Sequence, residues 1–229
     1  MRTGIFPIPN GWWVLIDKPP GWTSFDVVAR VRKITGEKKV GHVGTLDPFA
    51  TGLLVLAVGS ATKCLGEYLI GNKKYQATIQ LGAGSPSDDP GSKLQIRLQC
   101  PEFTKERILQ GLMKIAKAGM QKPPMVSALK RYGRPFYQLA RKGWWLEREN
   151  RPASINRLEC FEYDPLEGTV QLEVECGRGV YIRSIAHDLG EWLGIPALLS
   201  SLRRTVVGNY RIEDAISLNT LAETWNKIS

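Results

Sequence analysis

The sequence has few of the side chains that usually hold metal ions or form disulfide frameworks. Its 229 residues include two histidines, His42 and His187, and four widely spaced cysteines that form no C-x-x-C pair. Structural zinc sites and disulfide-stabilised scaffolds need closely spaced ligands or paired thiols. We therefore expect no metal centre and no disulfide framework, and the four cysteines are expected to be free, buried thiols.

Long apolar runs and nucleotide-binding loops are also missing. The apolar stretch LLVLAV, Leu53–Val58, is far shorter than the roughly 20 residues that a membrane-spanning helix needs. The N-terminal segment MRTGIFPIPNGWW lacks the apolar core of a signal peptide. No G-x-G-x-x-G opens a helix and no Walker lysine follows a glycine loop, so the sequence does not support a nucleotide cofactor. A cytoplasmic protein without membrane association is expected.

Positive charge is in excess and is concentrated in one segment. The chain has 31 Lys and Arg against 22 Asp and Glu, a formal charge of +9. Residues 121–151 carry eight of these cations against two glutamates: Lys122, Lys130, Arg131, Arg134, Arg141, Lys142, Arg148 and Arg151. Aromatic residues lie between them, and this combination suits a nucleic-acid surface, where cations meet phosphates and rings stack on bases. A solvated loop with its rings in the core is the alternative.

Helical and strand patterns are mixed along the chain without a regular βαβ rhythm. Helices are predicted at 23–36, with Thr23 or Ser24 as cap and Gly36 as end, and at 104–119, 181–194 and 217–226. Strands are predicted at 12–20, 53–58, 75–81, 94–99, 154–164, 169–177 and about 204–210, with loops at 41–52 and 82–92. This mixture favours an α+β fold, and the length favours one domain over residues 1–229.

The loop GHVGTLDPFATG, Gly41–Gly52, places a carboxylate, Asp47, directly before a proline. A residue before proline is pushed to extended backbone angles, which restrains how Asp47 projects. We expect Gly44 and Gly52 to let the backbone of another molecule approach. A simple Asp-Pro turn is the alternative to a reactive carboxylate. An arginine beside Asp47 would lower its pKa, and a tyrosine there could stack on a base.

Six stretches together carry a specific resemblance. They are DKPPGWTS, GHVGTLDPFATG, KKYQATIQLG, VSALK, RGVYIRSIAHDLGEWLG and LRRT, which run in order from about Asp17 to Arg204. In these motifs the chain resembles the tRNA pseudouridine synthase B family. The resemblance implies isomerisation of uridine 55, in the T loop of tRNA, to pseudouridine on a flipped-out base. It also implies a pseudouridine synthase fold, with a mixed, mainly antiparallel sheet flanked by helices and loops, and no cofactor or metal.

The resemblance also implies roles for individual residues. Asp47 matches the catalytic aspartate, Tyr75 the base-stacking tyrosine and Arg183 the arginine paired with the aspartate. The remaining matches surround the flipped uridine or support the site: His42, Tyr181, Leu202, Lys18 and Lys130. Segment 121–151 corresponds to an RNA-gripping insertion, in which Arg131, Arg134, Arg141 and Lys142 are expected to contact the RNA backbone.

Some features depart from the family pattern. The loop GAGSPSDDPGS, at 82–92, replaces a threonine- and aspartate-bearing run, and Val180 replaces a more usual threonine. The C-terminal PUA domain of many members is expected to be largely or wholly absent. The partner implied is the T arm of tRNA, with no protein partner, and a monomer is expected.

Two aspects of the chemistry stay open, as do two other functions. Asp47 could attack the uracil ring or the ribose, and Tyr75 is a candidate for removing the C5 proton. A non-catalytic RNA-binding or tRNA-folding module is one alternative function. An enzyme acting on a small anionic substrate is the other.

Overall fold

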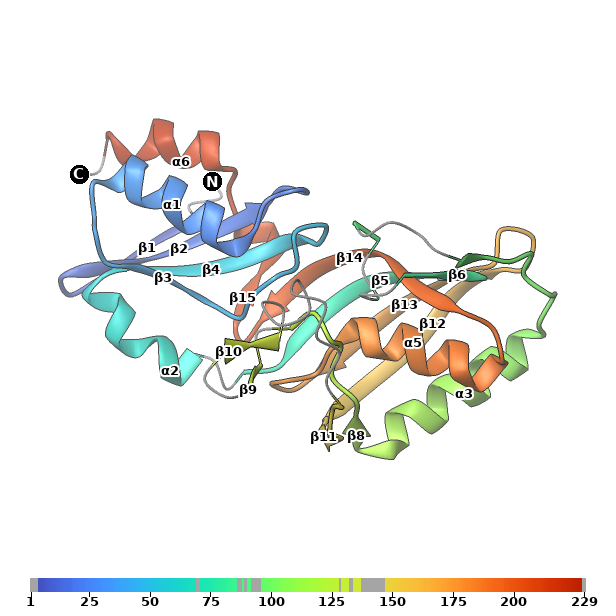
Figure 1. The fold of residues 1–229 in the computed structure, drawn as a ribbon. Helices are drawn as coiled ribbons and strands as arrows, with labels where there is room; N and C mark the ends of the chain where they lie inside the picture. The colour runs from blue at the N-terminus through green and yellow to red at the C-terminus, as the bar shows by residue number, and fades with distance from the viewer. Residues whose placement is uncertain are drawn as a thin grey trace. The chain divides into compact units, whose positions relative to one another are not determined.

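The computed structural model describes residues 4–68, 71–85, 88, 90–91, 96–127, 129–131, 134–136 and 147–227. The chain divides into two compact units. Unit 1 comprises Met1–Gln76 and Ser201–Ser229, and unit 2 comprises Ala77–Ser200. Two strands, β5 (Lys73–Leu81) and β14 (Ala197–Val207), contain residues of both units. Figure 1 labels the elements, and each unit is described by itself below.

The sheet of unit 1 is built around two long strands, β2 (Gly11–Lys18) and β4 (Thr51–Gly59), which pair antiparallel. On the outer side of β2 lies β1 (Ile5–Ile8), and β3 (Val40–Val43) pairs with part of β4. The other edge of β4 pairs in parallel with β14, which also pairs with β15 (Tyr210–Arg211). The register sets Lys18 and Arg204 opposite the same residue, Gly52, from its two sides.

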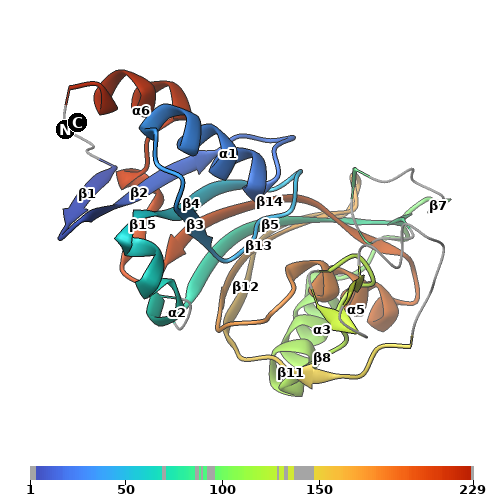
Figure 2. The same cartoon turned by 60° about the vertical axis from the view of Figure 1, so that its left-hand side comes forward.

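Helices cover both faces of this sheet. On one face α1 (Ser24–Thr35) and α6 (Leu218–Trp225) lie side by side, and their apolar residues form one core with the alternate side chains of β2 and β4 (Figures 1 and 2). On the other face, η1 (Ser60–Cys64) and the start of α2 (Leu65–Tyr68) pack on Leu15, Leu53 and Val55. A further 3-10 turn, η2 (Ile212–Asp214), precedes α6. Burial on both faces explains the unbroken apolar sequence of β4.

Local signals define α1 as the sequence predicts. Thr23 caps the helix, and it forms a reciprocal capping box with Asp26. Gly36 ends the helix in the left-handed conformation, with φ of 73°. The cap therefore sets the first residue of the helix at Ser24, shortly after the end of β2.

Unit 2 has two antiparallel strands, β12 (Ile155–Asp164) and β13 (Thr169–Cys176), with β5 next to β13. Two helices, α3 (Lys105–Ala118) and α5 (Ile182–Leu193), pack against each other beside these strands (Figure 2). The helices approach closely at Gly111, where an added Cβ would lie 2.4 Å from Cδ1 of Trp192. Short strand pairs complete the unit: β6 (Ala83–Gly84) with β7 (Ile96–Arg97), β8 (Met120–Gln121) with β11 (Arg151–Pro152), and β9 (Lys130–Arg131) with β10 (Arg134–Pro135).

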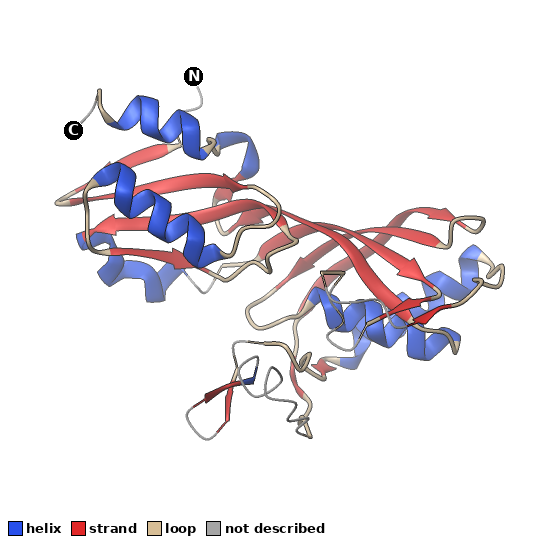
Figure 3. Cartoon of the chain, turned by 45° about the horizontal axis from the view of Figure 1, so that its top comes forward, coloured by secondary structure: helices blue, strands red, loops and turns tan. Residues whose placement is uncertain are grey.

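The α+β class is confirmed by helices packed on a sheet that is mixed and mainly antiparallel (Figure 3). Parallel pairing joins β4 with β14, and an isolated parallel bridge joins Ile16 and Ile216. Several boundaries differ from the predicted ones. The last long strand begins at Ala197 instead of Arg204, and residues Gly41–Val43 of the predicted loop belong to β3. The expectation of four buried thiols is also wrong, because only Cys176 is buried and the other three cysteines are half-buried. No helix in the described part of the chain is long and apolar enough to cross a bilayer.

Candidate active site

Asp47 lies in unit 1, on the connection between β3 and β4, and its side chain is half-buried. Leu46, the residue before it, is held by Ser24, the first residue of α1. The Ser24 hydroxyl accepts from the Leu46 N–H at 2.9 Å and lies 3.2 Å from the Leu46 carbonyl oxygen. Pro48, the residue after it, accepts from the Gly21 N–H at 2.9 Å. The backbone of Asp47 is therefore fixed on both sides.

Lys18, the last residue of β2, supports the same loop from below the surface. Its side chain is fully buried, and its Nζ donates to the carbonyl oxygens of Trp22, Pro19 and Pro48 at 2.6, 3.0 and 3.2 Å. The pKa of Lys18 is lowered to about 8, mainly by burial; the negative charge of Asp47 opposes the shift, and the positive charge of Arg204 contributes to it. Lys18 therefore links the end of β2, the start of α1 and the Asp47 loop.

Arg204 of β14 is a second buried cation at this loop, with none of its side-chain surface exposed. Its Nε donates to the carbonyl oxygen of Leu53 at 2.8 Å, and its Nη2 to those of Gly44 at 3.0 Å and Val43 at 3.5 Å. The guanidinium thus contacts carbonyls on both sides of Asp47 in the sequence. A planar group with several fixed donors suits this arrangement better than an ammonium would.

The glycines of the loop serve the chain's own packing, and the expectation that they also admit another molecule stays a prediction. At Gly52, with φ of 99°, an added Cβ would lie 2.3 Å from the carbonyl oxygen of Arg204. At Gly44, with φ of 68°, it would lie 3.2 Å from Nη1 of Arg204. Both positions lie against Arg204, so the glycines and the arginine form one structural feature.

Three other expected site residues lie in unit 1. Tyr75 belongs to β5 and Leu202 to β14, and both side chains are buried. His42 lies in β3, with Nε2 3.3 Å from the Thr45 hydroxyl. Burial and the nearby charge of Arg204 lower the pKa of His42, so its imidazole is neutral at neutral pH.

The remaining expected residues near the uridine lie in unit 2. Tyr181 is the N-cap residue of α5, and Gln121 binds its backbone twice: Oε1 accepts from the Tyr181 N–H and Nε2 donates to the Tyr181 carbonyl, each at 2.8 Å. Arg183, two residues later, is buried and donates through Nη2 to the Val126 carbonyl at 2.7 Å. Because Asp47 and Arg183 belong to different units, their pairing stays a prediction.

The basic segment is described in part. Lys130 and Arg131 form β9, and Arg134 begins β10. Arg141 and Lys142 lie outside the described residues, as do Tyr132, Tyr137, Trp144 and Trp145, and also Ser87 and Asp89 of the altered loop. Within the described part, Arg148 donates through Nη1 to the Pro123 carbonyl at 3.0 Å. The role of these cations in RNA binding therefore remains a prediction.

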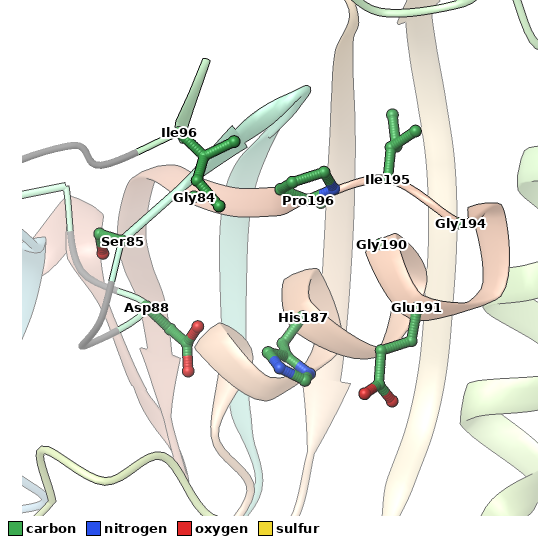
Figure 4. A pocket seen from close by; sticks show the side chains of 11 residues that line it. Gly84, Ser85, Asp88, Ile96, His187, Gly190, Glu191, Gly194, Ile195 and Pro196 are labelled. Atoms are coloured by element: carbon green, nitrogen blue, oxygen red, sulfur yellow. The ribbon is translucent and has the colours of Figure 1, made fainter. Parts of the chain in front are cut away.

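A pocket of about 450 Å³ lies within unit 2, between the 82–92 loop and α5 (Figure 4). Asp88, His187 and Glu191 project their polar groups into it. Burial raises the pKa of Asp88, and a hydrogen bond with Asp188 raises the pKa of His187. Ligand atoms of His187, Asp188 and Glu191 lie within 4.8 Å of one another and could hold a metal ion, but such exposed acidic groups are common without one.

Three positioning residues were missed by the sequence prediction. Ser24 was considered only as a helix cap, whereas its hydroxyl anchors Leu46. Arg204 lies in the quoted LRRT motif, but an arginine in a strand is normally expected at the surface. Gln121 marks the edge of the basic segment and carries no sequence signal for its contact with Tyr181.

Comparisons with known proteins agree with this arrangement of motifs. Residues 32–182 match the model of the TruB family pseudouridylate synthase N-terminal domain, and residues 183–228 match that of the tRNA pseudouridylate synthase B C-terminal domain. The chain is 42% identical over 215 residues to tRNA pseudouridine synthase B of Thermobifida fusca, covering 91% of this chain and 73% of that protein. It is 44% identical over 214 residues to the protein of the same name from Desulfotalea psychrophila, covering 91% and 87%.

A solved structure supports the fold. The chain matches one titled as a crystal structure of a Cbf5-Nop10-Gar1 complex with a TM-score of 0.72 and 30% identity. The match covers 93% of this chain but 54% of that chain, so this chain spans about half of that solved protein. With a family model over most of its length and relatives above 40% identity, the chain belongs to the TruB family of pseudouridylate synthases.

Proposed function

We propose that the chain converts uridine 55 in the T loop of tRNA to pseudouridine. The reaction breaks the bond between N1 of uracil and C1′ of ribose, and forms a bond between C5 of uracil and C1′. C5 loses a proton and N1 gains one, so the reaction is an isomerisation without net oxidation or reduction. The relatives reported above are named for this activity.

The observation that carries the proposal is the fixed backbone around a half-buried carboxylate. Ser24 holds Leu46, and Gly21 and Lys18 hold Pro48, so both neighbours of Asp47 are tied to the start of α1 and the end of β2. A simple turn would not need a buried lysine and a buried arginine as supports. A catalytic residue whose backbone is held in position before the substrate arrives loses less entropy in the reaction.

The proposed roles follow the family match. Asp47 acts as the nucleophile, on the uracil ring or on the ribose, and Tyr75 stacks on the flipped base and is the candidate for accepting the C5 proton. Arg183 keeps Asp47 ionised by charge pairing. Extraction of the base from its stack costs a few kcal/mol, which contacts with the RNA must offset. His42, Tyr181 and Leu202 enclose the uridine, while Lys18 and Lys130 support the site.

The basic segment is proposed to hold the RNA backbone. Arg131, Arg134, Arg141 and Lys142 would contact phosphates of the T arm, which we propose as the recognised part of tRNA. We further propose that the protein acts as a monomer in the cytoplasm without a protein partner. Light scattering of the purified chain with and without a T-arm stem-loop would measure the stoichiometry directly.

Release of tritium from [5-³H]uridine in tRNA tests the function. The wild-type chain should release tritium and Asp47→Asn should reduce release by at least 10³-fold, because an amide is a far poorer nucleophile than a carboxylate. Asp214→Asn, at an exposed aspartate of η2 in the same unit, is the matched control. Equal release by Asp47→Asn and wild type would disprove the catalytic role. RNA binding without release from any tRNA would favour the RNA-binding or tRNA-folding module.

A further inference from the structure

Two large aromatic side chains are exposed at the start of α1. Trp22 exposes 36% of its surface and Phe25 exposes 71%, although the same helix buries Val27, Val28 and Val31. Exposed apolar rings that lie close together on a protein surface commonly mark a binding site. The two exposed rings therefore mark a candidate binding surface.

The residues that carry these rings are connected to the Asp47 loop. Nζ of Lys18 donates to the carbonyl oxygens of both Trp22 and Pro48, and the N–H of Gly21 also donates to Pro48. On the other ring, Phe25 meets the imidazole of His42 edge to face, with the ring centroids 5.9 Å apart and the planes at 76°. The backbone of Trp22 thus belongs to the turn bound by Lys18, and the ring of Phe25, on α1, lies beside His42, a residue expected at the uridine.

Cations line the surface next to Trp22. A groove of about 460 Å³ is bordered by Gly21, Trp22, Asp26, Ala29, Arg30 and Lys33. Positions 26, 30 and 33 share one face of the helix, with Arg30 one turn and Lys33 two turns beyond Asp26. The Asp26 carboxylate accepts hydrogen bonds from the Thr23 N–H and hydroxyl at 2.8 and 2.6 Å, so it is engaged at the helix cap. Positive charge increases along the groove away from the rings.

We propose that Trp22 and Phe25 form a stacking surface for unpaired bases next to the target uridine, and that Arg30 and Lys33 contact the adjoining phosphates. The inference rests on the proposed function and extends it to a surface outside the basic segment. Bases of an RNA loop are unstacked and present flat faces that aromatic rings bind. Rings followed by cations match such a strand, whereas an apolar protein surface would leave Arg30 and Lys33 without anionic partners.

Binding of a T-arm stem-loop to ring variants tests the inference. Phe25→Ala and Trp22→Ala should each weaken binding by about 5- to 150-fold, the range observed when a stacking ring is removed. The turnover rate at saturating RNA should change by less than about threefold, because these contacts are made equally in the ground and transition states. Phe25→Tyr should restore binding, whereas Phe25→Leu should not. Phe161→Ala, at an exposed phenylalanine of β12, is the control.

The salt dependence separates stacking from charge. Arg30→Gln and Lys33→Gln should each make the slope of log affinity against log salt shallower by roughly 0.7 to 0.9, the value for one phosphate contact, whereas the ring variants should leave the slope unchanged. Photocrosslinking provides an independent readout. Stem-loops with 4-thiouridine beside the target position should attach to the peptide that contains Trp22 and Phe25.

Each outcome bears on one proposal. If Phe25→Ala and Trp22→Ala bind the stem-loop with wild-type affinity and no crosslink forms at this peptide, the stacking surface is wrong. The proposed function would stand in that case, provided that the wild-type chain releases tritium. Absence of tritium release by the wild-type chain would instead overturn the proposed function. Thermal unfolding of every variant guards against misfolding, and the exposed Phe25 keeps the test decisive if Trp22→Ala unfolds. Trp22→Leu is the second variant at that position.

Discussion

The ammonium group of Lys18 lies 3.2 Å from the carbonyl oxygen of Pro48, the residue that follows Asp47. The same group donates to the carbonyls of Pro19 and Trp22, so its three protons match three acceptors. A buried charge is tolerated where hydrogen bonds replace its hydration. The backbone next to the proposed nucleophile is thus held in part by a residue of a different element, β2.

The pH dependence of turnover should report the protonation of Lys18. Below pH 8 the ammonium supplies three donors, whereas above its pKa of about 8 the neutral amine supplies two donors and no charge. The turnover rate should therefore fall as pH rises through about 8. Lys18→Arg, which stays charged throughout, should lower the rate but remove this alkaline decline. Single-turnover rates from pH 6 to 9.5 provide the measurement, and an unchanged decline in Lys18→Arg would assign it to another group.

Removal of the Arg204 side chain should affect turnover more than RNA binding. Arg204→Met leaves the carbonyls of Leu53 and Gly44 without their buried donor, and should lower the free energy of unfolding by about 3 to 5 kcal/mol. We expect kcat to fall by at least about tenfold, with KM for the stem-loop within about threefold, when both are measured well below the unfolding midpoint. Arg204→Lys should recover part of the loss. Arg32→Met, which removes one partly buried contact with the Val40 carbonyl, should change neither quantity; a parallel loss there would indicate a general effect of removing cations.

Substitution by alanine should be tolerated far less well at Gly52 than at another glycine with positive φ. Gly52→Ala places a Cβ 2.3 Å from the carbonyl oxygen of Arg204, so β4 and β14 cannot keep their pairing, and the folded protein should not accumulate. Gly36→Ala has a similar backbone requirement, with φ of 73°, but open space around the added atom. It should cost only about 1 kcal/mol. The yield of soluble, folded protein after matched expression, checked by circular dichroism, compares the two, and equal yields would show that φ alone decides.

Gln121 should stabilise the start of α5. Gln121→Leu leaves the N–H and the carbonyl of Tyr181 without their side-chain partners and should lower the free energy of unfolding by about 2 to 3 kcal/mol. Turnover should fall as well, because Arg183 lies two residues further along the chain. Gln171→Leu, which removes a single exposed contact with Glu162, is the control and should remain within about 0.5 kcal/mol. If Gln121→Leu is as stable as the wild type, apolar packing and not Gln121 holds the start of α5.

Elements with strong local signals were predictable from the sequence. The capping box of Thr23 and Asp26 and the left-handed Gly36 define α1 within a short stretch, and its bounds agree with the prediction. The start of β14 was missed because its stability comes from distant partners, such as the bond from the Ser200 hydroxyl to the Thr78 carbonyl. The first three residues of β14, 197–199, are all buried, so the sequence there does not alternate between apolar and polar residues as a half-exposed strand would.

The same distinction applies to the candidate site. Asp47 was identified from a contiguous motif, and the structure adds its supports. Arg204 was missed because its burial requires carbonyls about 150 to 160 residues away, which no local pattern reveals. The direction of the Lys18 pKa also depends on tertiary burial and could not be read from DKPP.

The parallel pairing of β14 with β4 has a consequence for synthesis of the chain on the ribosome. Unit 2 occupies one continuous stretch, Ala77–Ser200, whereas unit 1 needs residues from both ends of the sequence. Arg204, which pairs with Gly52, and Trp225, which completes the core beside α1, are translated after all of unit 2. Until those residues are synthesised, the apolar side chains of the N-terminal strands remain partly uncovered, in a state prone to non-native association. Mutations that slow the folding of unit 2 should lower the yield of folded unit 1, although they lie outside it.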